Sequence, residues 1–252
     1  MIVVVDYQKG NIRSVARGLE AAGAQVVVSQ DAEVIAHADA VVLPGVGAFA
    51  DAMRTMEELG QDEAVRAAIE RGAPFLGICL GMHLMFEAGE EHAEGDGPTP
   101  GLGLIPGVVC RMSRTDAEGI PYKIPHVGWN AVNSVPTSGG GCAHKASSAR
   151  AGTSSGRSVR AGLSERLSIA PAAMGDAPQS LFEGIPSGEH FYFTHSYIAP
   201  ESDATIATTT HSVTFPCAVR HGAAFGVQFH PEKSSDAGQR LLANFVRFAR
   251  KA

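Results

Sequence analysis

Continuous apolar runs and helically spaced apolar positions alternate along the N-terminal part of the chain. The continuous runs occupy residues 2–5, 25–28, 40–43 and 74–78. Runs of this kind are typical of strands that are covered on both faces. Residues 11–23 and 61–72 instead have apolar positions at helical spacing, and each segment ends in a glycine suited to a helix C-terminus. This alternation predicts an α/β fold with a largely parallel central sheet and flanking helices.

The second half of the chain is richer in predicted strands. These are expected at residues 107–112, 122–129, 189–197, 203–210 and 225–230. The chain then closes with an amphipathic helix at 237–251, on which Leu241, Leu242, Phe245 and Phe248 share one apolar stripe. We therefore expect a single α/β domain over residues 1–252, with a strand-rich second half.

One segment, residues 136–180, departs from this pattern. It contains no aromatic residue, two thirds of it is Gly, Ala, Ser, Thr or Pro, and it has five basic and two acidic residues. Such a composition buries too little apolar surface to offset the entropy lost on ordering. The sequence therefore predicts that a flexible surface insertion, and not a second domain, interrupts the chain here.

Composition argues against several classes of function. The 252 residues are 44% hydrophobic, enough for one sizeable core, and the net charge of −6 disfavours nucleic acid and anionic membranes as partners. No apolar stretch approaches the ~20 residues of a membrane span, and the first apolar run is too short for a signal peptide. The four cysteines are scattered without C-x-x-C spacing, which argues against a disulfide framework or zinc site and fits reduced cytoplasmic thiols. We expect no metal and no cofactor. They are Cys79, Cys110, Cys142 and Cys217.

The sequence Gly-Ile-Cys-Leu-Gly at residues 77–81 follows an apolar strand and precedes a helical stretch. It has the form of a nucleophile elbow with cysteine in place of serine. Glycines are needed because a sharp strand-to-helix turn leaves no room for side chains beside the nucleophile. The turn directs the following amides, Leu80 N–H first, toward the oxyanion of a tetrahedral intermediate. Cys79 is therefore the candidate nucleophile, although a buried structural cysteine also fits so short a pattern.

A second motif, Phe-His-Pro-Glu-Lys-Ser, occupies residues 229–234 after another apolar strand. His230 and Glu232 are two residues apart, and we expect Pro231 to keep the segment extended, so that both side chains point to one side. A base and a carboxylate that orients it are what a cysteine nucleophile requires. Together with the elbow, this motif predicts a triad of Cys79, His230 and Glu232.

A glycine-rich loop, Leu-Pro-Gly-Val-Gly-Ala-Phe, lies at residues 43–49, at the end of the third predicted strand. Ligand sites of such sheets lie outside the carboxyl ends of the strands, where Cys79 is also expected. The glycines permit backbone amides to face a ligand. Gly45, Val46 and Gly47 are therefore candidates for the oxyanion site, although an ordinary strand-to-helix loop has the same composition.

These motifs resemble those of class I glutamine amidotransferases, and in particular the glutaminase subunits of imidazole glycerol phosphate synthase. The general resemblance rests on residues 77–82 and 229–232. The more specific resemblance covers nearly all of the chain outside 136–180. It rests on the segments 6–15, 43–49, 101–107, 123–130, 192–197, 230–235 and 238–245.

The resemblance implies a three-layer fold and a defined reaction. In the family, the residue at Cys79 attacks the side-chain amide of glutamine and forms a glutamyl thioester. The residue at His230, oriented by Glu232, protonates the departing ammonia and then activates water. The ammonia passes to a (β/α)₈-barrel cyclase subunit of histidine biosynthesis, so a heterodimer is expected. The interface residues implied are His126, Trp129, Asn130, Tyr192 and Lys233.

Substrate contacts also follow from the resemblance, with two departures. Leu80 N–H and the backbone of residues 45–47 are similar to the family's oxyanion elements, and Ser196 matches a position near bound glutamine. His83 stands where relatives have a glutamine that holds the substrate, and an imidazole can donate one hydrogen bond in its place. Gln8 replaces a glycine of the N-terminal motif, which matters little if that turn does not need a positive φ.

Two other interpretations stay open at this point. The chain could be the glutaminase of another biosynthetic pathway, with the same chemistry and a different acceptor. It could also be an inactive homologue that only binds a partner, which the change at His83 and the segment 136–180 make conceivable. Retention of all three triad residues favours an active enzyme.

Overall fold

The computed structural model describes residues 1–93, 97–135 and 181–252, and it contains a nine-stranded sheet within them. The strand order is β2-β1-β3-β4-β13-β12-β11-β8-β9. The strands are β1 Ile2–Val5, β2 Val26–Ser29, β3 Ala40–Gly45, β4 Phe75–Cys79, β8 His126–Ser134, β9 Glu189–His195, β11 Thr205–Thr210, β12 Thr214–His221 and β13 Ala224–Val227. The insertion predicted at 136–180 lies outside the described residues.

The sheet changes from parallel to antiparallel pairing near its middle. Strands β2, β1, β3, β4 and β13 are parallel to one another, whereas β12, β11, β8 and β9 extend the sheet through antiparallel pairs. The inner parallel strands are buried along their whole length, as their continuous apolar runs require. The predicted α/β class, with a large sheet, flanking helices and a strand-rich second half, is confirmed.

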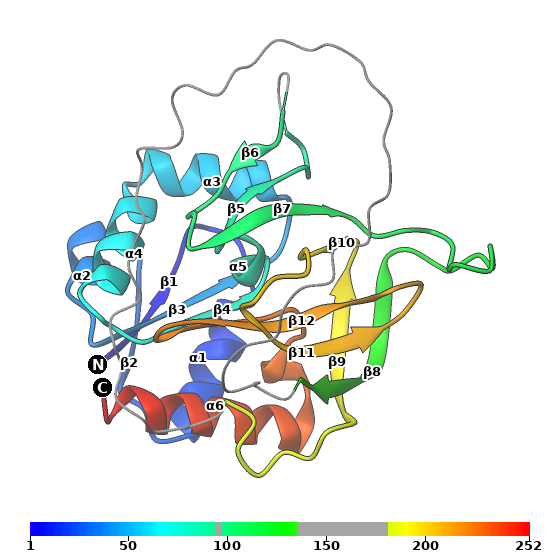
Figure 1. Ribbon diagram of the computed structural model, residues 1–252. Coiled ribbons are helices and arrows are strands. Elements are labelled where there is room, and N and C mark those ends of the chain that lie inside the picture. Colours follow the sequence, from blue (N-terminus) through cyan, green and yellow to red (C-terminus); the bar gives the residue numbers. More distant parts are fainter. Residues whose placement is uncertain (94–96, 136–180) are drawn as a thin grey trace.

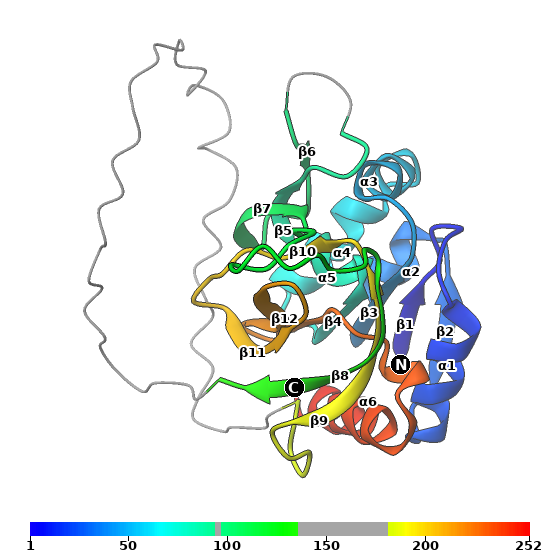
Figure 2. The same ribbon diagram turned by 90° about the vertical axis from the view of Figure 1, so that its right-hand side faces the viewer.

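Helices cover both faces of the sheet (Figures 1 and 2). On one face lie α1, Ile12–Ala21, and α6, Ser235–Ala249; on the other lie α2, Ala32–Ala36, α3, Phe49–Glu58, and α4, Gln61–Glu70. Alternate residues of each parallel strand therefore enter different cores, with Val3 and Val5 facing α2–α4 and Val4 facing α1 and α6. Among the described residues, no helix is long and apolar enough to cross a membrane.

Helices α1, α4 and α6 occur where the apolar spacing predicted them, but two helices were not expected. The short helix α2 follows Asp31, whose carboxylate accepts a hydrogen bond from Glu33 N–H at 2.9 Å. Helix α3 follows the glycine-rich loop and buries Phe49, Met53 and Met56. Five residues are too few to display a helical period, so α2 had only its N-cap as a sequence signal.

A second sheet of four strands has the order β10-β7-β5-β6. Its strands are β5 Phe86–Gly89, β6 Thr99–Pro100, β7 Ile105–Arg111 and β10 Tyr197–Ile198. The prediction of one strand over 189–197 is wrong, because β9 ends at His195 and the chain turns at Ser196 to pair β10 with β7. Aromatic residues continue across the turn, so hydrophobic pattern alone does not reveal a change of sheet.

Two further boundaries differ from the predictions. The strand expected at 122–129 begins only at His126, directly after Pro125, which has no N–H to donate to a ladder, and continues to Ser134. The strand expected at 225–230 ends at Val227, so His230 lies three residues beyond β13. This second shift matters for the site, because it places the motif at 229–234 in a turn instead of a strand.

The departure at Gln8 has a structural consequence. Gln8 adopts φ 67, and its N–H donates to Asp6 Oδ1 at 2.8 Å. The turn therefore does need a positive φ, and a glycine there would meet that need without steric strain. A non-glycine residue in this conformation costs roughly 1–2 kcal/mol.

Candidate active site

Cys79 occupies a sharp turn between β4 and the single-turn helix α5, Leu80–His83. Its backbone has φ 55 and ψ −108, a conformation that a non-glycine residue rarely adopts. A Cβ on Gly81 would stand 1.8 Å from Leu43 O, and one on Gly77 would stand 2.5 Å from Gly81 O. The flanking glycines are therefore required by close packing of β3, β4 and α5, as the elbow pattern indicated.

Pairing of β4 with β13 brings the second motif to the cysteine. The two strands are parallel, and Ile78 lies opposite Val227 in their register. The residues that follow these two, Cys79 and Gln228, therefore lie at the same edge of the sheet. Their side chains approach at 3.8 Å, from Gln228 Nε2 to Cys79 Sγ.

The segment after His230 is not extended. Residues Pro231–Lys233 form a 3₁₀-helix, so the expectation that Pro231 keeps His230 and Glu232 in an extended segment is wrong. Proline suits the first position of a helical turn, where its fixed φ fits and its missing N–H has no partner to lose. The tight turn nevertheless brings the two side chains together, with His230 Nδ1 at 2.9 Å from Glu232 Oε1.

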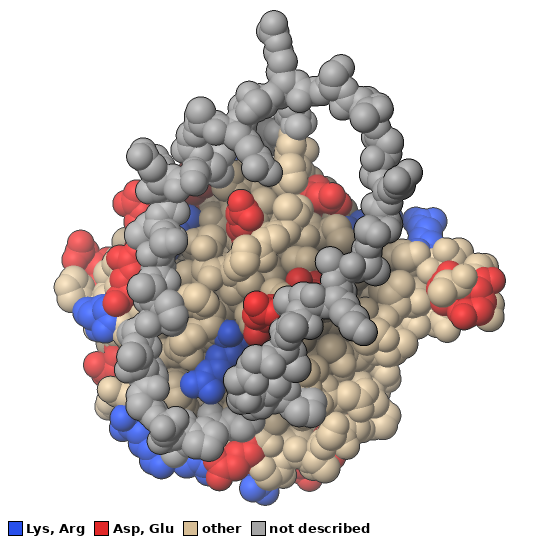
Figure 3. Space-filling model, viewed as in Figure 1, with Lys and Arg blue, Asp and Glu red and all other residues tan. Residues whose placement is uncertain are grey.

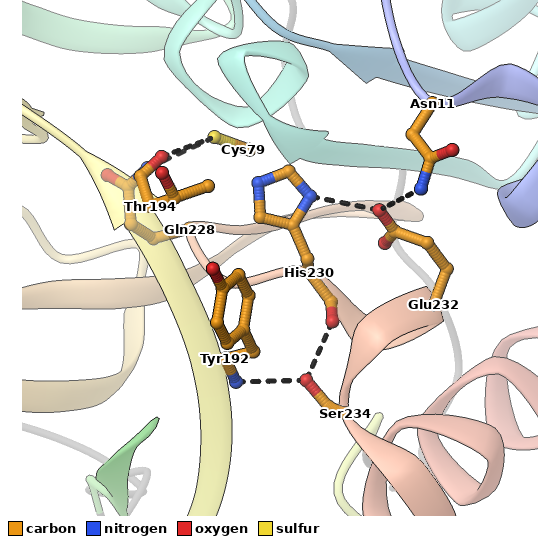
Figure 4. A network of polar contacts seen from close by, with 8 residues as sticks. All are labelled: Asn11, Cys79, Tyr192, Thr194, Gln228, His230, Glu232 and Ser234. Atoms are coloured by element: carbon orange, nitrogen blue, oxygen red, sulfur yellow. Dashed lines mark hydrogen bonds and ion pairs between the residues drawn. The ribbon is translucent and has the colours of Figure 1, made fainter. Parts of the chain in front are cut away.

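Glu232 is fixed from its other side by Asn11. Asn11 Nδ2 donates to Glu232 Oε1 at 3.2 Å from the start of α1 (Figure 4). Burial opposes ionisation of Glu232, but His230 and Asn11 hold its pKa below the ordinary value. Sequence reasoning assigned no role to Asn11; its only signal was a place in the N-terminal motif at 6–15, 221 positions away from Glu232.

The ring of His230 lies between Cys79 and Glu232 (Figure 4). Its side chain and that of Glu232 are exposed by only 2% and 1%. Burial disfavours a charged ring, but Cys79 and Glu232 outweigh it and raise the pKa of His230 to about 10. Its Nε2 is buried without a hydrogen-bond partner among the described residues and faces the cysteine. The ring can therefore hold a proton beside the sulfur.

The backbone of His230 is tied to β9. Its N–H donates to Tyr192 O at 2.9 Å, and its carbonyl accepts from Ser234 Oγ at 2.6 Å. Ser234 Oγ in turn accepts from Tyr192 N–H at 3.0 Å (Figure 4). The hydroxyl thereby links the turn to the neighbouring strand, which fixes where the imidazole stands.

A cavity of about 310 Å³ opens beside Cys79. The predicted site residues on its wall are Val46, Gly47, Leu80, His83 and Ser196. Gly45 lies behind the wall, where a Cβ would stand 2.2 Å from Tyr7 Oη. A larger cavity of about 440 Å³ lies near the two chain ends, and no predicted site residue lines it. The cavity at Cys79 is of a size that small ligands use, and Cys79 itself forms part of its wall.

His83 is buried and already has a partner. Its Nε2 lies 2.6 Å from Gln228 Oε1, and burial lowers the pKa of the ring to about 4 against the opposing effect of that hydrogen bond. A neutral imidazole has one N–H, and Gln228 uses it. The expectation that His83 donates to glutamine in place of the usual amide is therefore wrong for this conformation, because only an acceptor nitrogen remains.

A buried thiol, an imidazole and a carboxylate in line beside a cavity are the groups of nucleophilic acyl transfer. The described residues include no group of three or more His, Cys, Asp or Glu side chains that could hold a metal ion. The profile of the family described as "Glutamine amidotransferase class-I" matches residues 3–248. The chain belongs to the class-I glutamine amidotransferases.

Curated relatives of this amidotransferase are similar to it over almost their full length. The imidazole glycerol phosphate synthase subunit HisH of Geobacillus kaustophilus is 38% identical over 99% of this chain and 97% of its own. The subunit of the same name from Thiobacillus denitrificans is 40% identical over 97% of this chain and 90% of its own. The resemblance to these glutaminase subunits, drawn from the motifs, is confirmed.

Solved structures support the amidotransferase fold. A crystal structure of a glutamine amidotransferase matches 99% of this chain and 100% of its own with a TM-score of 0.62 and 18% identity. The PurLQS structure from Thermotoga maritima covers 98% of this chain and 97% of its own, with a TM-score of 0.60 and 15% identity. At these identities the likeness concerns the fold alone.

The residues predicted at a partner interface fall into two groups in this amidotransferase. Trp129 and Tyr192 are cross-strand partners whose rings lie 6.2 Å apart, and Lys233 Nζ lies 5.8 Å from the Tyr192 ring. Trp129 is 52% exposed. His126, by contrast, is buried. The side chain of Asn130, the residue after Trp129, donates from Nδ2 to Thr210 O at 2.7 Å.

Around the exposed group, the surface carries few charges. Val127 is 56% exposed beside Trp129, and β8 and β11 contain no Lys, Arg, Asp or Glu. In Figure 3 the face over these strands is correspondingly uncharged. Exposed apolar and aromatic side chains on a surface with few charges are typical of a protein contact.

Buried histidines lie beneath that surface. His195 Nδ1 donates to Tyr197 O at 2.9 Å, which leaves its Nε2 to accept from His126 Nδ1 at 3.1 Å. His126 Nε2 then faces Asn130 Nδ2 at 3.4 Å. Burial lowers the pKa of His126 to about 4, with His211 adding to the effect, and that of His195 is lowered as well. A chain of neutral rings thus runs from Asn130 to the wall of the cavity.

Proposed function

We propose that this chain hydrolyses L-glutamine to glutamate and ammonia. The observation that carries the proposal is the alignment of Cys79, His230 and Glu232 beside a cavity, in a chain of the class-I amidotransferase family. We further propose that it is the glutaminase subunit of an imidazole glycerol phosphate synthase. Near-full-length similarity to subunits of that name supports this assignment.

The first half of the reaction uses the thiolate and the charged imidazole. Cys79 Sγ attacks the amide carbon of glutamine, and the oxyanion is received by Leu80 N–H and amides of the 45–47 loop. His230 gives its Nε2 proton to the amide nitrogen as the carbon–nitrogen bond breaks, so that ammonia leaves and a glutamyl thioester remains. Glu232 supports the ring while its charge changes, because it accepts from Nδ1 in both states.

The second half restores the enzyme. His230, now neutral, takes a proton from a water that attacks the thioester carbon. The carbon–sulfur bond breaks, glutamate is released, and the thiolate–imidazolium pair forms again. Ser196 and His83 on the cavity wall are placed to contact the substrate. His83 then offers an acceptor nitrogen, in contrast to the amide donor that relatives have.

The ammonia must reach the enzyme that uses it without escaping into solvent. We propose a heterodimer with a (β/α)₈-barrel cyclase subunit, which uses the ammonia to make imidazole glycerol phosphate and aminoimidazole carboxamide ribonucleotide in histidine biosynthesis. The group of Trp129, Tyr192 and Lys233, in which Trp129 and Lys233 are exposed and Tyr192 is half-buried, supports a docking face. Tyr192 also supports His230 through its backbone. The free cysteines of the described residues support a cytoplasmic location.

Replacement of Cys79 by alanine tests the proposal. In a complex with the cyclase subunit, Cys79→Ala is expected to lower glutamine-dependent synthesis by about 10⁴–10⁶-fold and to leave ammonia-dependent synthesis intact. The matched control is Cys110→Ala, which removes a half-buried thiol from β7 in the second sheet, outside the lining of the cavity. Substantial glutaminase activity in Cys79→Ala would show that another group is the nucleophile. Loss of both activities would point to a broken complex.

A further inference from the structure

Gln228 is a fully buried amide that joins two residues of the site. Its Oε1 lies 2.6 Å from His83 Nε2, and its Nε2 lies 3.8 Å from Cys79 Sγ. Figure 4 shows the side chain beside the cysteine, on the side away from Glu232. The triad mechanism gives Gln228 no role, and the motif analysis assigned none.

The direction of these hydrogen bonds is fixed by His83. A carbonyl oxygen only accepts, so His83 Nε2 must be the donor to Gln228 Oε1. The ring has one proton when it is neutral, and that proton is then on Nε2. With its oxygen held by His83, the amide can turn only its N–H₂ group toward Cys79. A buried amide without this anchor could rotate and present its oxygen to the sulfur instead.

The other polar atom near the sulfur is of the opposite kind. Thr194 O lies 3.9 Å from Cys79 Sγ and accepts from the neutral thiol. Once the thiol has lost its proton, that carbonyl faces a negative sulfur and no longer stabilises it. Gln228 Nε2–H makes a stronger hydrogen bond to the ionised sulfur than to the thiol, because bonds to a charged partner are stronger.

We propose that Gln228 is a positioning residue that holds a hydrogen-bond donor against the Cys79 thiolate, and that His83 fixes the direction of this donor. The proposal rests on the proposed function only in taking Cys79 as the nucleophile. It also gives a use to the imidazole at position 83. The side chain at position 83 keeps the amide of Gln228 oriented by donating to its oxygen. Either histidine or glutamine at position 83 can supply that donor.

Titratable groups surround the sulfur on every side. His230 approaches from the turn after β13 with Glu232 behind it, and His83 approaches from α5. His195 lines the cavity from β9, as do Glu91 and Tyr197 from other segments, and Tyr7 lies beneath the elbow. Burial raises the pKa of Glu91 above its ordinary value. Burial keeps the pKa of His83 and His195 low, so these two rings stay neutral at pH 7. His230 supplies the charge that pairs with the sulfur, and Gln228 supplies a neutral donor with a fixed direction.

The test measures ionisation of the sulfur without using glutamine. The full chain is alkylated with iodoacetamide over a range of pH, and mass spectrometry follows the Cys79 peptide so that other cysteines do not contribute. In Gln228→Met, which keeps the length of the side chain but has no donor, the pH of half-maximal alkylation should rise by about one unit. His83→Leu should raise it too, whereas His83→Gln, which keeps a donor, should leave it unchanged.

A control separates this effect from general loss of buried hydrogen bonds. Asn244 is buried and donates to Leu181 O and Glu183 O at 2.9 Å each, away from the site. Asn244→Met should lower thermal stability without moving the alkylation profile. If Gln228→Met does not fold, the comparison of His83→Leu with His83→Gln carries the test, because only the first removes the donor.

Two results would overturn the proposal. One is an unchanged alkylation profile in folded Gln228→Met and His83→Leu. The other is an equal shift in Asn244→Met, which would make the effect one of stability. Glutaminase assays with the cyclase subunit add a second reading: Gln228→Met should lose kcat/KM mainly at low pH and recover at high pH. Because alkylation needs no glutamine, its outcome stands apart from that of the Cys79→Ala test of function.

Discussion

Buried histidines should make the chain sensitive to mild acid, and His83→Gln should remove part of that sensitivity. His83 is 4% exposed, and its pKa in the folded chain is about 4, against an ordinary value of 6.5. Between these two values the unfolded chain takes up a proton at this position and the folded chain does not. The free energy of unfolding therefore falls as pH decreases from 6.5 toward 4, and is unaffected by this group above 6.5.

The magnitude follows from the two pKa values. Each pH unit within the window changes the free energy of unfolding by about 1.4 kcal/mol per group, so His83 should account for a loss of about 2 kcal/mol between pH 7 and pH 5. His126 has the same pKa of about 4 and should contribute a similar loss, which His83→Gln leaves in place. His230, with its raised pKa, and the carboxylates contribute equally to both proteins, so they cancel in the comparison.

Urea unfolding followed by circular dichroism, at pH 7 and at pH 5 under reducing conditions, measures the effect. The loss of unfolding free energy between the two pH values should be smaller in His83→Gln than in the native chain by about 2 kcal/mol. His190→Gln is the matched control, because it makes the same substitution at an exposed position on β9. Equal pH dependence in His83→Gln and the native chain would refute the idea of a neutral, buried ring at position 83.

Three further outcomes are expected. Gln8→Gly should raise the free energy of unfolding by roughly 0.5–1 kcal/mol in urea titrations, because glycine relieves the left-handed backbone at φ 67; an unchanged or lower value would contradict that reading. The lone chain should hydrolyse glutamine slowly, and the cyclase subunit with its nucleotide substrate should raise the rate of hydrolysis. The reason is that the glycine-rich loop at 45–47 can rest with its amides turned away from the substrate. Full activity of the lone chain would contradict this. Replacing residues 137–179 by a short Gly/Ser linker should leave the melting temperature and the partner-stimulated glutaminase activity nearly unchanged. The reason is that β8 and β9 already pair with each other, and Gly188 N–H donates to Val132 O at 2.8 Å where they meet. A tenfold loss of partner affinity would instead make the segment a docking element.

Local sequence was enough for the parts of the site that depend on local sterics. Cys79 could be chosen because a nucleophile elbow needs glycine on both sides, and Gly77 and Gly81 each lie two residues from it in the chain. His230 and Glu232 could be chosen because they share one short motif. The shape of that motif was not predictable in the same way: Pro231 fits an extended segment and a helical turn equally well, and packing of Ser234 against β9 selects the turn.

Partners from distant segments could not be chosen from the sequence. Asn11 meets Glu232 across 221 positions, and Gln228 meets Cys79 across 149. An asparagine near a helix start and a glutamine after a strand are common, and neither carries a local signal of its own. The sequence likewise could not show that His83 Nε2 donates to Gln228, because that hydrogen bond depends on which side chain the fold places beside the ring.

The sequence by itself determined the alternation of strands and helices and the family, and it selected the three candidate residues of the triad, because periodicity and motif spacing act over a few residues. Only the tertiary structure decided that β13 pairs in parallel with β4, with Ile78 opposite Val227, and that pairing is what brings the two motifs to one edge of the sheet. It also decided which side chains are buried. Burial keeps His83 neutral, whereas Cys79 and Glu232 keep His230 charged against the effect of burial, since the protonation of an enclosed ring depends on the groups that enclose it.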